Sequence, residues 1–308
     1  MIKVLNLCKS FDGFQALHNV NVTVPKGSVY GIVGPNGSGK TTLIKHMVGI
    51  LIPDQGTIKI DENEVFDNPA VKKRIAYIPD DIYFFLQDDM KDMINSYRRV
   101  YPAFNDERLE KLIPLFPLDP KMPIRRFSRG MKKHVAFIMA LCSMPDVLVL
   151  DEPMDGLDPV ARRKVWSLLF QDIAERETTV FVSSHNLREL EDVCDHVGIM
   201  HRGEVVLERS LDELQNNIFK LQMAFRNESP DFNSLNVLAE HKVGSVIQLV
   251  VRGERKEILD KAVMLNPLMI DVLPLSLEEI FIHELGGMDY AIVNPQINGS
   301  RRGPFLSD

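Results

Sequence analysis

The chain has 308 residues, of which 45% are hydrophobic, and a net charge of −7. This length allows one large domain and a smaller one, and the negative charge argues against a protein that coats nucleic acid, so no nucleic-acid partner is expected. No apolar run approaches the roughly 18 residues of a membrane-spanning helix, and the N-terminus lacks the apolar core of a signal peptide. The cysteines Cys8, Cys142 and Cys194 have no metal-ligand spacing and no disulfide pattern, which favours a reducing cytosol.

Short strand patterns alternate with turns over residues 1–66. Residues 20–24, 29–33 and 56–60 are apolar or alternating runs, and each is bounded by glycine, proline or polar residues. The run at 29–33 precedes a helical pattern whose predicted core positions are Leu43, Met47 and Ile50.

Residues 80–145 are helical in pattern. One predicted helix has a single face made of Met90, Met93, Ile94, Tyr97 and Tyr101. Asn105 is a candidate N-cap of a second helix, which Pro114 ends or kinks. A third helix is predicted to start after Ser128 and to stop before Pro145, with Met131, Val135, Ile138 and Cys142 as its apolar stripe.

Strand patterns return at residues 147–150 and 179–182, with a helix predicted over 160–174 between them. Apolar strands that alternate with helices indicate a parallel α/β sheet. Residues 197–200 and 205–207 resemble a hairpin, and from about residue 211 alternating strands indicate a further small unit. A capping box, Ser276 with Glu279, opens its last helix.

The segment between the strand at 29–33 and its helix is a complete phosphate-binding loop of the form GxxxxGK[ST]. Glycines let successive backbone N–H groups turn toward a polyphosphate, and the N-terminus of the helix adds partial positive charge. Lys40 is expected to reach the β- and γ-phosphates, and the Thr41 hydroxyl is expected to bind Mg²⁺. The predicted nucleotide contacts are Gly34, Pro35, Asn36, Gly37, Ser38, Gly39, Lys40, Thr41 and Thr42.

Two acids follow the buried strand at 147–150. Asp151 is a candidate Mg²⁺ ligand, and Glu152 is the candidate general base for an attacking water. His185 lies at the tip of the next strand, where ligands of open α/β sheets collect, and is a candidate γ-phosphate sensor. The sequence therefore predicts hydrolysis of a nucleoside triphosphate, with Lys40, Glu152 and His185 as catalytic residues.

With these motifs in place, residues 1–210 resemble the ATPase subunits of ATP-binding cassette (ABC) transporters of bacterial efflux type. The segment Phe127-Ser-Arg-Gly-Met131 stands where the family has its LSGGQ signature; Ser128 and Gly130 match, whereas Arg129 and Met131 depart from it. The resemblance implies that Ser128 and Gly130 contact ATP held by the opposite subunit of a dimer. Asp155-Gly-Leu-Asp158 is similar to the family's D-loop, which joins the two sites.

Weaker matches extend the resemblance. Phe11 stands where the family stacks an aromatic ring on adenine, with Phe14 as a nearby rival. Asp80 replaces the family's Q-loop glutamine and is a further candidate Mg²⁺ ligand. Residues 83–85 (Tyr-Phe-Phe) lie in the region where family members dock their membrane partner, and packing inside the helical subdomain is an equal alternative.

The expected fold is a P-loop NTPase core with a parallel sheet, an N-terminal antiparallel subdomain and a helical subdomain at about 80–145. An α+β accessory domain follows at 211–288, with a loose tail at 289–308. The resemblance implies an ATPase that uses ATP and Mg²⁺ on the cytoplasmic face of the membrane. It would drive a separately encoded permease as a homodimer or as a heterodimer with a paralogue. The alternative is a soluble ABC-type ATPase or nucleotide switch that is not coupled to transport.

Overall fold

The computed structural model describes residues 1–84, 89–119, 122–226 and 230–284. The chain divides into two compact units, each considered separately below. The first unit comprises Met1–His185 and Val193–Glu208, and the second comprises Asn186–Asp192 and Arg209–Asp308. The sequence predicts a boundary near residue 210 but does not predict that the short segment after His185 belongs to the second unit. The predicted tail at 289–308 and Phe85 lie outside the described residues.

The N-terminal sheet of the first unit has four strands in the order β2-β1-β4-β5. Its central pairs are antiparallel, with Ile2 of β1 opposite Val24 of β2 and Ile60 of β4. Alternating side chains bury one face of β1 and β2, as expected for an antiparallel sheet with one solvated face. The strands are β1 (Ile2–Phe11), β2 (Phe14–Val24), β4 (Gln55–Ile60) and β5 (Asn63–Glu64).

The second sheet of this unit has six strands in the order β10-β9-β3-β8-β7-β6. The strands β9, β3, β8, β7 and β6 are mutually parallel, and β3, β7 and β8 are buried along their whole length. This arrangement confirms the predicted α/β class. The strands are β3 (Val29–Val33), β6 (Ile75–Ile78), β7 (Val147–Leu150), β8 (Thr179–Ser184), β9 (His196–His201) and β10 (Glu204–Ser210).

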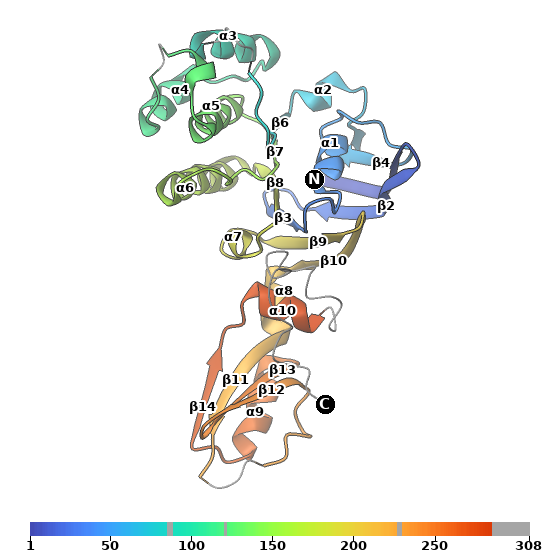
Figure 1. Ribbon diagram of the computed structural model, residues 1–308, viewed down its shortest axis with the longest axis vertical. Helices are drawn as coiled ribbons and strands as arrows, with labels where there is room; N and C mark the ends of the chain where they lie inside the picture. Colours follow the sequence, from blue (N-terminus) through green and yellow to red (C-terminus); the bar gives the residue numbers. More distant parts are fainter. Residues whose placement is uncertain (85–88, 120–121, 227–229, 285–308) are drawn as a thin grey trace. The chain divides into compact units, whose positions relative to one another are not determined.

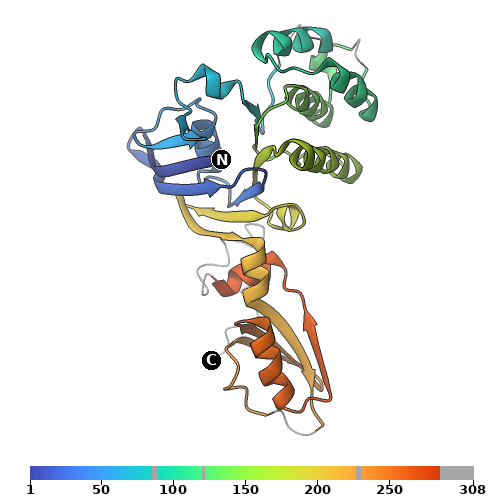
Figure 2. The ribbon, with the colours of Figure 1, turned by 180° about the vertical axis from the view of Figure 1, so that it is seen from behind.

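Helices cover both faces of the parallel sheet. Helix α1 (Lys40–Met47) lies on the face toward the antiparallel sheet, and α5 (Arg129–Cys142) and α6 (Pro159–Arg176) lie on the opposite face (Figures 1 and 2). Leu43 and Met47 belong to the core between the two sheets. Ile50 does not: α1 ends before Gly49, whose φ of +70° turns the chain, and Ile50 is 56% exposed, so its predicted core position is wrong.

Helix α2 (Pro69–Lys72) precedes β6, and its Val71 belongs to the core between the two sheets. The helical region contains α3 (Met90–Val100) and α4 (Asp106–Leu112), with 3₁₀ turns at Ile113–Leu115 and Ile124–Arg126. Asn105 caps α4 by accepting a hydrogen bond from the amide of Arg108 at 2.9 Å. Pro114 follows in the 3₁₀ turn, where the α-helix has ended. Both features confirm the predicted cap and break. No helix within the described residues combines the length and the apolar character needed to cross a membrane.

The second unit is built on a sheet with the strand order β12-β13-β11-β14, antiparallel in each pair. The Ser276–Glu279 capping box is present, with the Glu279 amide donating to the Ser276 hydroxyl and Glu279 accepting from the Ser276 amide. The predicted pattern missed β12, α7, α8 and α9. The elements are α7 (Arg188–Glu191), α8 (Leu211–Asn217), β11 (Ile218–Ala224), β12 (Val237–Val243), β13 (Val246–Arg252), α9 (Arg255–Met264), β14 (Met269–Leu273) and α10 (Leu277–Glu284).

Helix α7 packs with α10 inside the second unit. Glu191 accepts a hydrogen bond from the Leu277 amide at 2.9 Å, which satisfies a free N–H group at the start of α10. Arg188 and Glu278 form an ion pair at 3.0 Å. These contacts explain why residues 186–192, although they directly follow a strand of the first unit, group with the C-terminal domain.

A buried ion cluster holds α6 to the helical region. Asp172 on α6 is 2% exposed and pairs with Arg108 of α4 at 2.5 Å and with Arg176 at 3.8 Å. We expect Asp172→Asn to lower the free energy of unfolding by about 3 kcal/mol, because two guanidinium groups lose their buried counter-charge. The measurement is urea denaturation followed by the fluorescence of Trp166, the single tryptophan of the chain, which lies on the same helix.

The matched control is Glu62→Gln. Its partner is Lys3 at 2.5 Å, but both side chains are about half exposed or more. Exposed pairs contribute little, so we expect a change below about 1 kcal/mol. Equal losses in the two variants would show that burial does not distinguish these pairs.

Candidate active site

At several positions of the loop between β3 and α1, the backbone conformation or a close neighbour leaves room only for glycine. Gly37 and Gly39 have φ values of +79° and +111°, in the left-handed region that favours glycine. A Cβ at Gly39 would lie 2.7 Å from the Met200 side chain, and one at Gly34 would lie 2.2 Å from the Met200 carbonyl oxygen. The glycines therefore permit both the turn and the close packing of the loop on β9.

Lys40 is folded into this loop. Its Nζ donates to the carbonyl oxygens of Gly34 at 2.6 Å and Pro35 at 3.3 Å, and its side chain is 6% exposed. The same Nζ lies 3.5 Å from Oε1 of Glu152. The lysine predicted to bind phosphate and the carboxylate predicted to act as the base thus lie next to each other.

The loop fits an anionic ligand in two further respects. Ser38 is buried, yet its hydroxyl has no hydrogen-bond partner among the described residues. Such an orphaned donor is satisfied by a phosphate oxygen. Asn36 and Thr41 are exposed and Thr42 is half-buried, so the polar side chains at the start of α1 are accessible to a ligand.

The two acids after β7 are joined through one hydroxyl. Asp151 is buried, and its Oδ1 accepts a hydrogen bond from Oγ of Ser183 at 2.6 Å. The same Oγ accepts from the Glu152 amide at 2.9 Å. The sequence reasoning did not assign a role to Ser183; the serine pair at the end of an apolar run, directly before the histidine, was the available signal. A carboxylate at Asp151 and a hydroxyl at Thr41 are oxygen donors of the kind that Mg²⁺ prefers.

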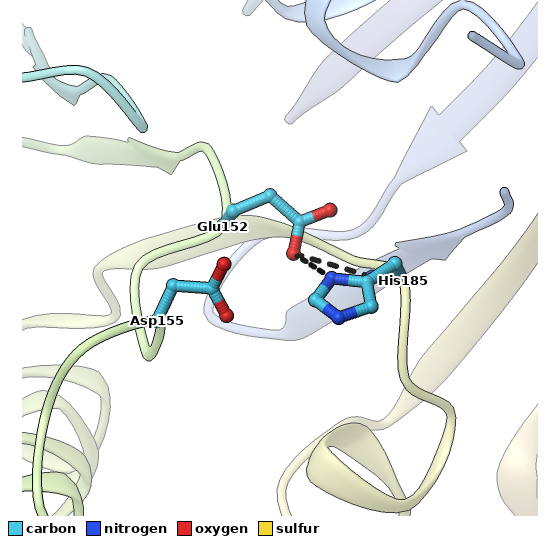
Figure 3. A group of neighbouring side chains, drawn as sticks. All are labelled: Glu152, Asp155 and His185. Carbon is cyan, nitrogen blue, oxygen red and sulfur yellow. Dashed lines mark hydrogen bonds and ion pairs between the residues drawn. The ribbon is translucent and has the colours of Figure 1, made fainter. Parts of the chain in front are cut away.

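Glu152 and His185 form a dyad at the ends of β7 and β8 (Figure 3). Oε2 of Glu152 accepts from Nδ1 of His185 at 2.9 Å and from the His185 amide at 3.2 Å. Oε1 is buried and has no hydrogen-bond partner in the described part of the chain. Asp155 lies beside the dyad, with one ligand atom of each residue within 4.8 Å of the others. The oriented carboxylate therefore keeps one oxygen for a further donor, as a base acting on water requires.

The backbone of Glu152 is strained. Its φ of +45° is in the left-handed region, which costs a non-glycine residue on the order of 1–3 kcal/mol. Such a conformation persists only when the surroundings fix it, and strain of this kind clusters at functional sites. The hydrogen bonds at the amide and at the carboxylate of Glu152 supply part of that restraint.

The signature-like segment opens α5. Ser128 is its N-cap, and its hydroxyl accepts from the Met131 amide at 3.2 Å. A Cβ at Gly130 would lie 3.0 Å from the carbonyl oxygen of Gly156, so the glycine permits close approach to the D-loop. Within this single chain the segment makes these local contacts, and whether Ser128 and Gly130 act on a partner's nucleotide stays a prediction.

Asp80 was predicted as a candidate metal ligand, but its contacts with Arg129 and Lys133 were not predicted. Asp80 forms an ion pair with Arg129 at 2.6 Å and lies 3.9 Å from Nζ of Lys133. Lys133 donates to the carbonyl oxygen of Glu152 at 2.6 Å, and burial lowers the pKa of Lys133. The role of Asp80 as a metal ligand stays a prediction, and Lys133 was not singled out from the sequence.

Phe11 ends β1 and is 41% exposed. It lies opposite Phe14 in the register of β1 and β2, and Phe14 is 69% exposed. Nζ of Lys9 lies 5.4 Å from the centroid of the Phe11 ring. Both rings are accessible to a base, so stacking of adenine on Phe11 remains a prediction with Phe14 as its rival.

The site is that of a P-loop nucleoside triphosphatase, and comparisons with known proteins define its family. Residues 17–155 match the family model described as ABC transporter. The chain is 32% identical over 288 residues to the ABC transporter ATP-binding protein YtrB of Bacillus subtilis (strain 168), a match that covers 93% of this chain and 99% of that protein. It is 29% identical over 305 residues to the bacitracin transport ATP-binding protein BcrA of Bacillus licheniformis, covering 93% and 98% of the two chains.

A solved ATP-binding subunit of an ABC transporter is similar in structure, with a TM-score of 0.65 and 27% identity; it covers 70% of this chain and 91% of that one. The chain therefore belongs to the family of ABC transporter ATP-binding proteins. It is the ATP-binding, ATP-hydrolysing subunit of such a transporter.

The assignment of Glu152 as the general base is testable by Glu152→Gln. The amide keeps the size of the side chain but cannot take a proton, so we expect turnover to fall by roughly 10²–10⁴-fold. ATP binding should persist, because the phosphate loop is unchanged. Phosphate release and equilibrium nucleotide binding are the two measurements.

Glu175→Gln on the exposed face of α6 is the matched control and should hydrolyse ATP like the wild type. Turnover of Glu152→Gln within a few-fold of the wild-type rate would remove Glu152 from the role.

Proposed function

We propose that this chain works as a dimer on the cytoplasmic face of the membrane and drives export through a separately encoded permease. The observation that carries the proposal is the Glu152 carboxylate beside the phosphate loop: Oε2 is hydrogen-bonded to His185, and Oε1 lies 3.5 Å from Lys40 and makes no hydrogen bond within the described residues. The printed name of BcrA, a bacitracin transport ATP-binding protein, supports a role in transport, and export follows the resemblance to efflux-type cassettes. The dimer is either two copies of this chain or one copy with a paralogue.

In the proposed reaction, the loop N–H groups and Lys40 bind the phosphates of ATP, and Oε1 of Glu152 takes a proton from the attacking water. The water oxygen bonds to the γ-phosphorus while the bond to the β–γ bridging oxygen breaks. Thr41 and Asp151 would hold Mg²⁺, which neutralises charge on the phosphate oxygens when bound. The sequence also predicts Asp80 as a ligand, but its ion pairs with Arg129 and Lys133 favour a different role. His185 keeps Glu152 oriented and reaches the γ-phosphate from the strand tip.

Co-purification tests the coupling to a permease. We expect the tagged chain to recover a membrane-spanning protein from detergent-solubilised membranes of its source cells, with a higher ATPase rate in the complex than alone. Tyr83, which is 76% exposed, lies in the segment predicted to dock the partner. Tyr83→Ala should weaken recovery, whereas Val263→Ala, at a 58% exposed site of the second unit, should not.

If no membrane-spanning protein is recovered and the isolated chain already shows its full ATPase rate, the soluble ATPase is the better assignment.

Sharing of each site between two subunits predicts complementation. Lys40→Ala removes the phosphate contact, and Ser128→Arg blocks the segment proposed to act on the partner's ATP. Each variant alone should be inactive if the chain forms homodimers. A mixed dimer places both lesions in one site and leaves the other intact, so mixing should restore part of the ATPase activity, and more at higher protein concentration.

Subunit exchange is verified by co-purification of two differently tagged variants. Hydrolysis by Ser128→Arg alone at the wild-type rate would exclude a shared site.

A further inference from the structure

Lys133 is a buried cation that the proposed reaction does not use. It lies on the second turn of α5, and its side chain is 0% exposed. Burying an ammonium group costs free energy unless it is paired and hydrogen-bonded, and an apolar side chain of similar length would pack there without that cost. The charge must therefore be explained by what it contacts.

Its main contact is the backbone of Glu152. Nζ of Lys133 donates to the Glu152 carbonyl oxygen at 2.6 Å, a charge-assisted hydrogen bond of short length. On the other side of the same residue, the Glu152 amide donates to Ser183 at 2.9 Å. Both peptide groups that flank the Glu152 Cα atom are thereby fixed, and the direction of the side chain follows from them.

The fixed backbone matters because Glu152 has a φ of +45°. A left-handed glutamate relaxes toward negative φ when its restraints are lost, and this rotation would turn its carboxylate away from His185. The hydrogen bond from Lys133 opposes that relaxation at the carbonyl.

Among the described residues, the carboxylate within ion-pair distance of Lys133 is that of Asp80. Oδ1 of Asp80 lies 3.9 Å from Nζ of Lys133 and 2.6 Å from Nη2 of Arg129, so Asp80 pairs with two cations of α5. Asp80 follows β6, Arg129 is the first residue of α5, and Glu152 follows β7. Three segments at the edge of the site are thus joined through Lys133.

We propose that Lys133 is a positioning residue for hydrolysis, which holds the Glu152 carbonyl with Asp80 as its counter-ion and so fixes the carboxylate against the attacking water. The inference rests on the proposed role of Glu152 as the general base. It assigns Asp80 a function through Lys133, distinct from metal binding.

The test compares Lys133→Met, which keeps the length of the side chain but cannot donate, with Lys133→Gln, which keeps a donor. Displacing a catalytic group by about an ångström costs up to about 10²-fold, so kcat of Lys133→Met should fall about 10- to 100-fold. KM for ATP and equilibrium nucleotide binding should stay within about threefold, because Lys133 does not contact the phosphate loop. Lys133→Gln should regain part of kcat.

Lys132→Met, a half-buried neighbour on the same helix, is the matched control and should keep the wild-type kcat. Urea denaturation followed by Trp166 fluorescence shows whether Lys133→Met is folded, because this variant loses a buried charge but also leaves the Glu152 carbonyl oxygen without its donor. If Lys133→Met does not fold, Lys133→Leu, which also lacks a donor, takes its place: kcat reduced with KM unchanged supports the proposal, and wild-type kcat overturns it.

Three results would overturn the assignment: a wild-type kcat in Lys133→Met, a parallel loss of nucleotide binding, or a Lys133→Gln variant as inactive as a folded Lys133→Met. The experiments distinguish a failure of the positioning role of Lys133 from a failure of the proposed function. If Glu152→Gln hydrolyses ATP normally, the base assignment fails; if Glu152→Gln is inactive and Lys133→Met is normal, only the positioning role fails.

A double-mutant cycle tests Asp80 as the counter-ion. Asp80→Asn should lower kcat several-fold in the wild-type chain and add little in the Lys133→Met background. The Mg²⁺ concentration for half-maximal turnover should stay unchanged. An equal loss in both backgrounds together with a raised Mg²⁺ requirement would make Asp80 a metal-side residue and overturn its role as counter-ion.

Discussion

The parallel register of three buried strands determines where every polar group of the site can lie. Val182 of β8 is opposite Gly31 of β3 on one side and Leu150 of β7 on the other. The segments that follow these strands therefore leave the sheet at one edge, and Glu152 and His185 meet there although 33 residues separate them. Parallel strands of an α/β sheet collect ligand-binding residues at their carboxyl ends for this reason.

A strained residue at that edge is stabilised by polar contacts from several elements. The Glu152 amide donates to Ser183, its carboxylate accepts from His185, and its carbonyl oxygen accepts from Lys133 of α5. Its carboxylate also lies 3.5 Å from Lys40. Each contact restrains a different atom of the residue. The local geometry is thus a property of the assembled sheet and helices. The residues next to Glu152 in the sequence do not determine it by themselves.

The sequence predicted the buried strands β3, β7 and β8, the phosphate loop and the acid pair because each is a local pattern, whereas it missed β6. It did not predict the environment of Lys133. The apolar stripe of α5 leaves Lys133 off its face, which is typical of an exposed lysine, yet residues 133–142 are all buried because this helix is covered on every side. The ion pair of Asp80 with Arg129 joins residues 49 positions apart, and no periodicity contains such information. Strand β12 was missed for a related reason, since its charged run Glu240-His-Lys242 hides the alternation.

Helix α5 connects two proposed functions through its own rigidity. Its N-cap, Ser128, belongs to the segment proposed to meet the partner's nucleotide, and its second turn holds the carbonyl of Glu152. An α-helix transmits displacement along its axis because its backbone hydrogen bonds resist stretching. A shift of the N-terminus of α5 when the dimer closes would therefore act on Lys133 and on Asp80 beside it. The segment proposed to meet the partner's nucleotide and the group that fixes the base are thus parts of one helix.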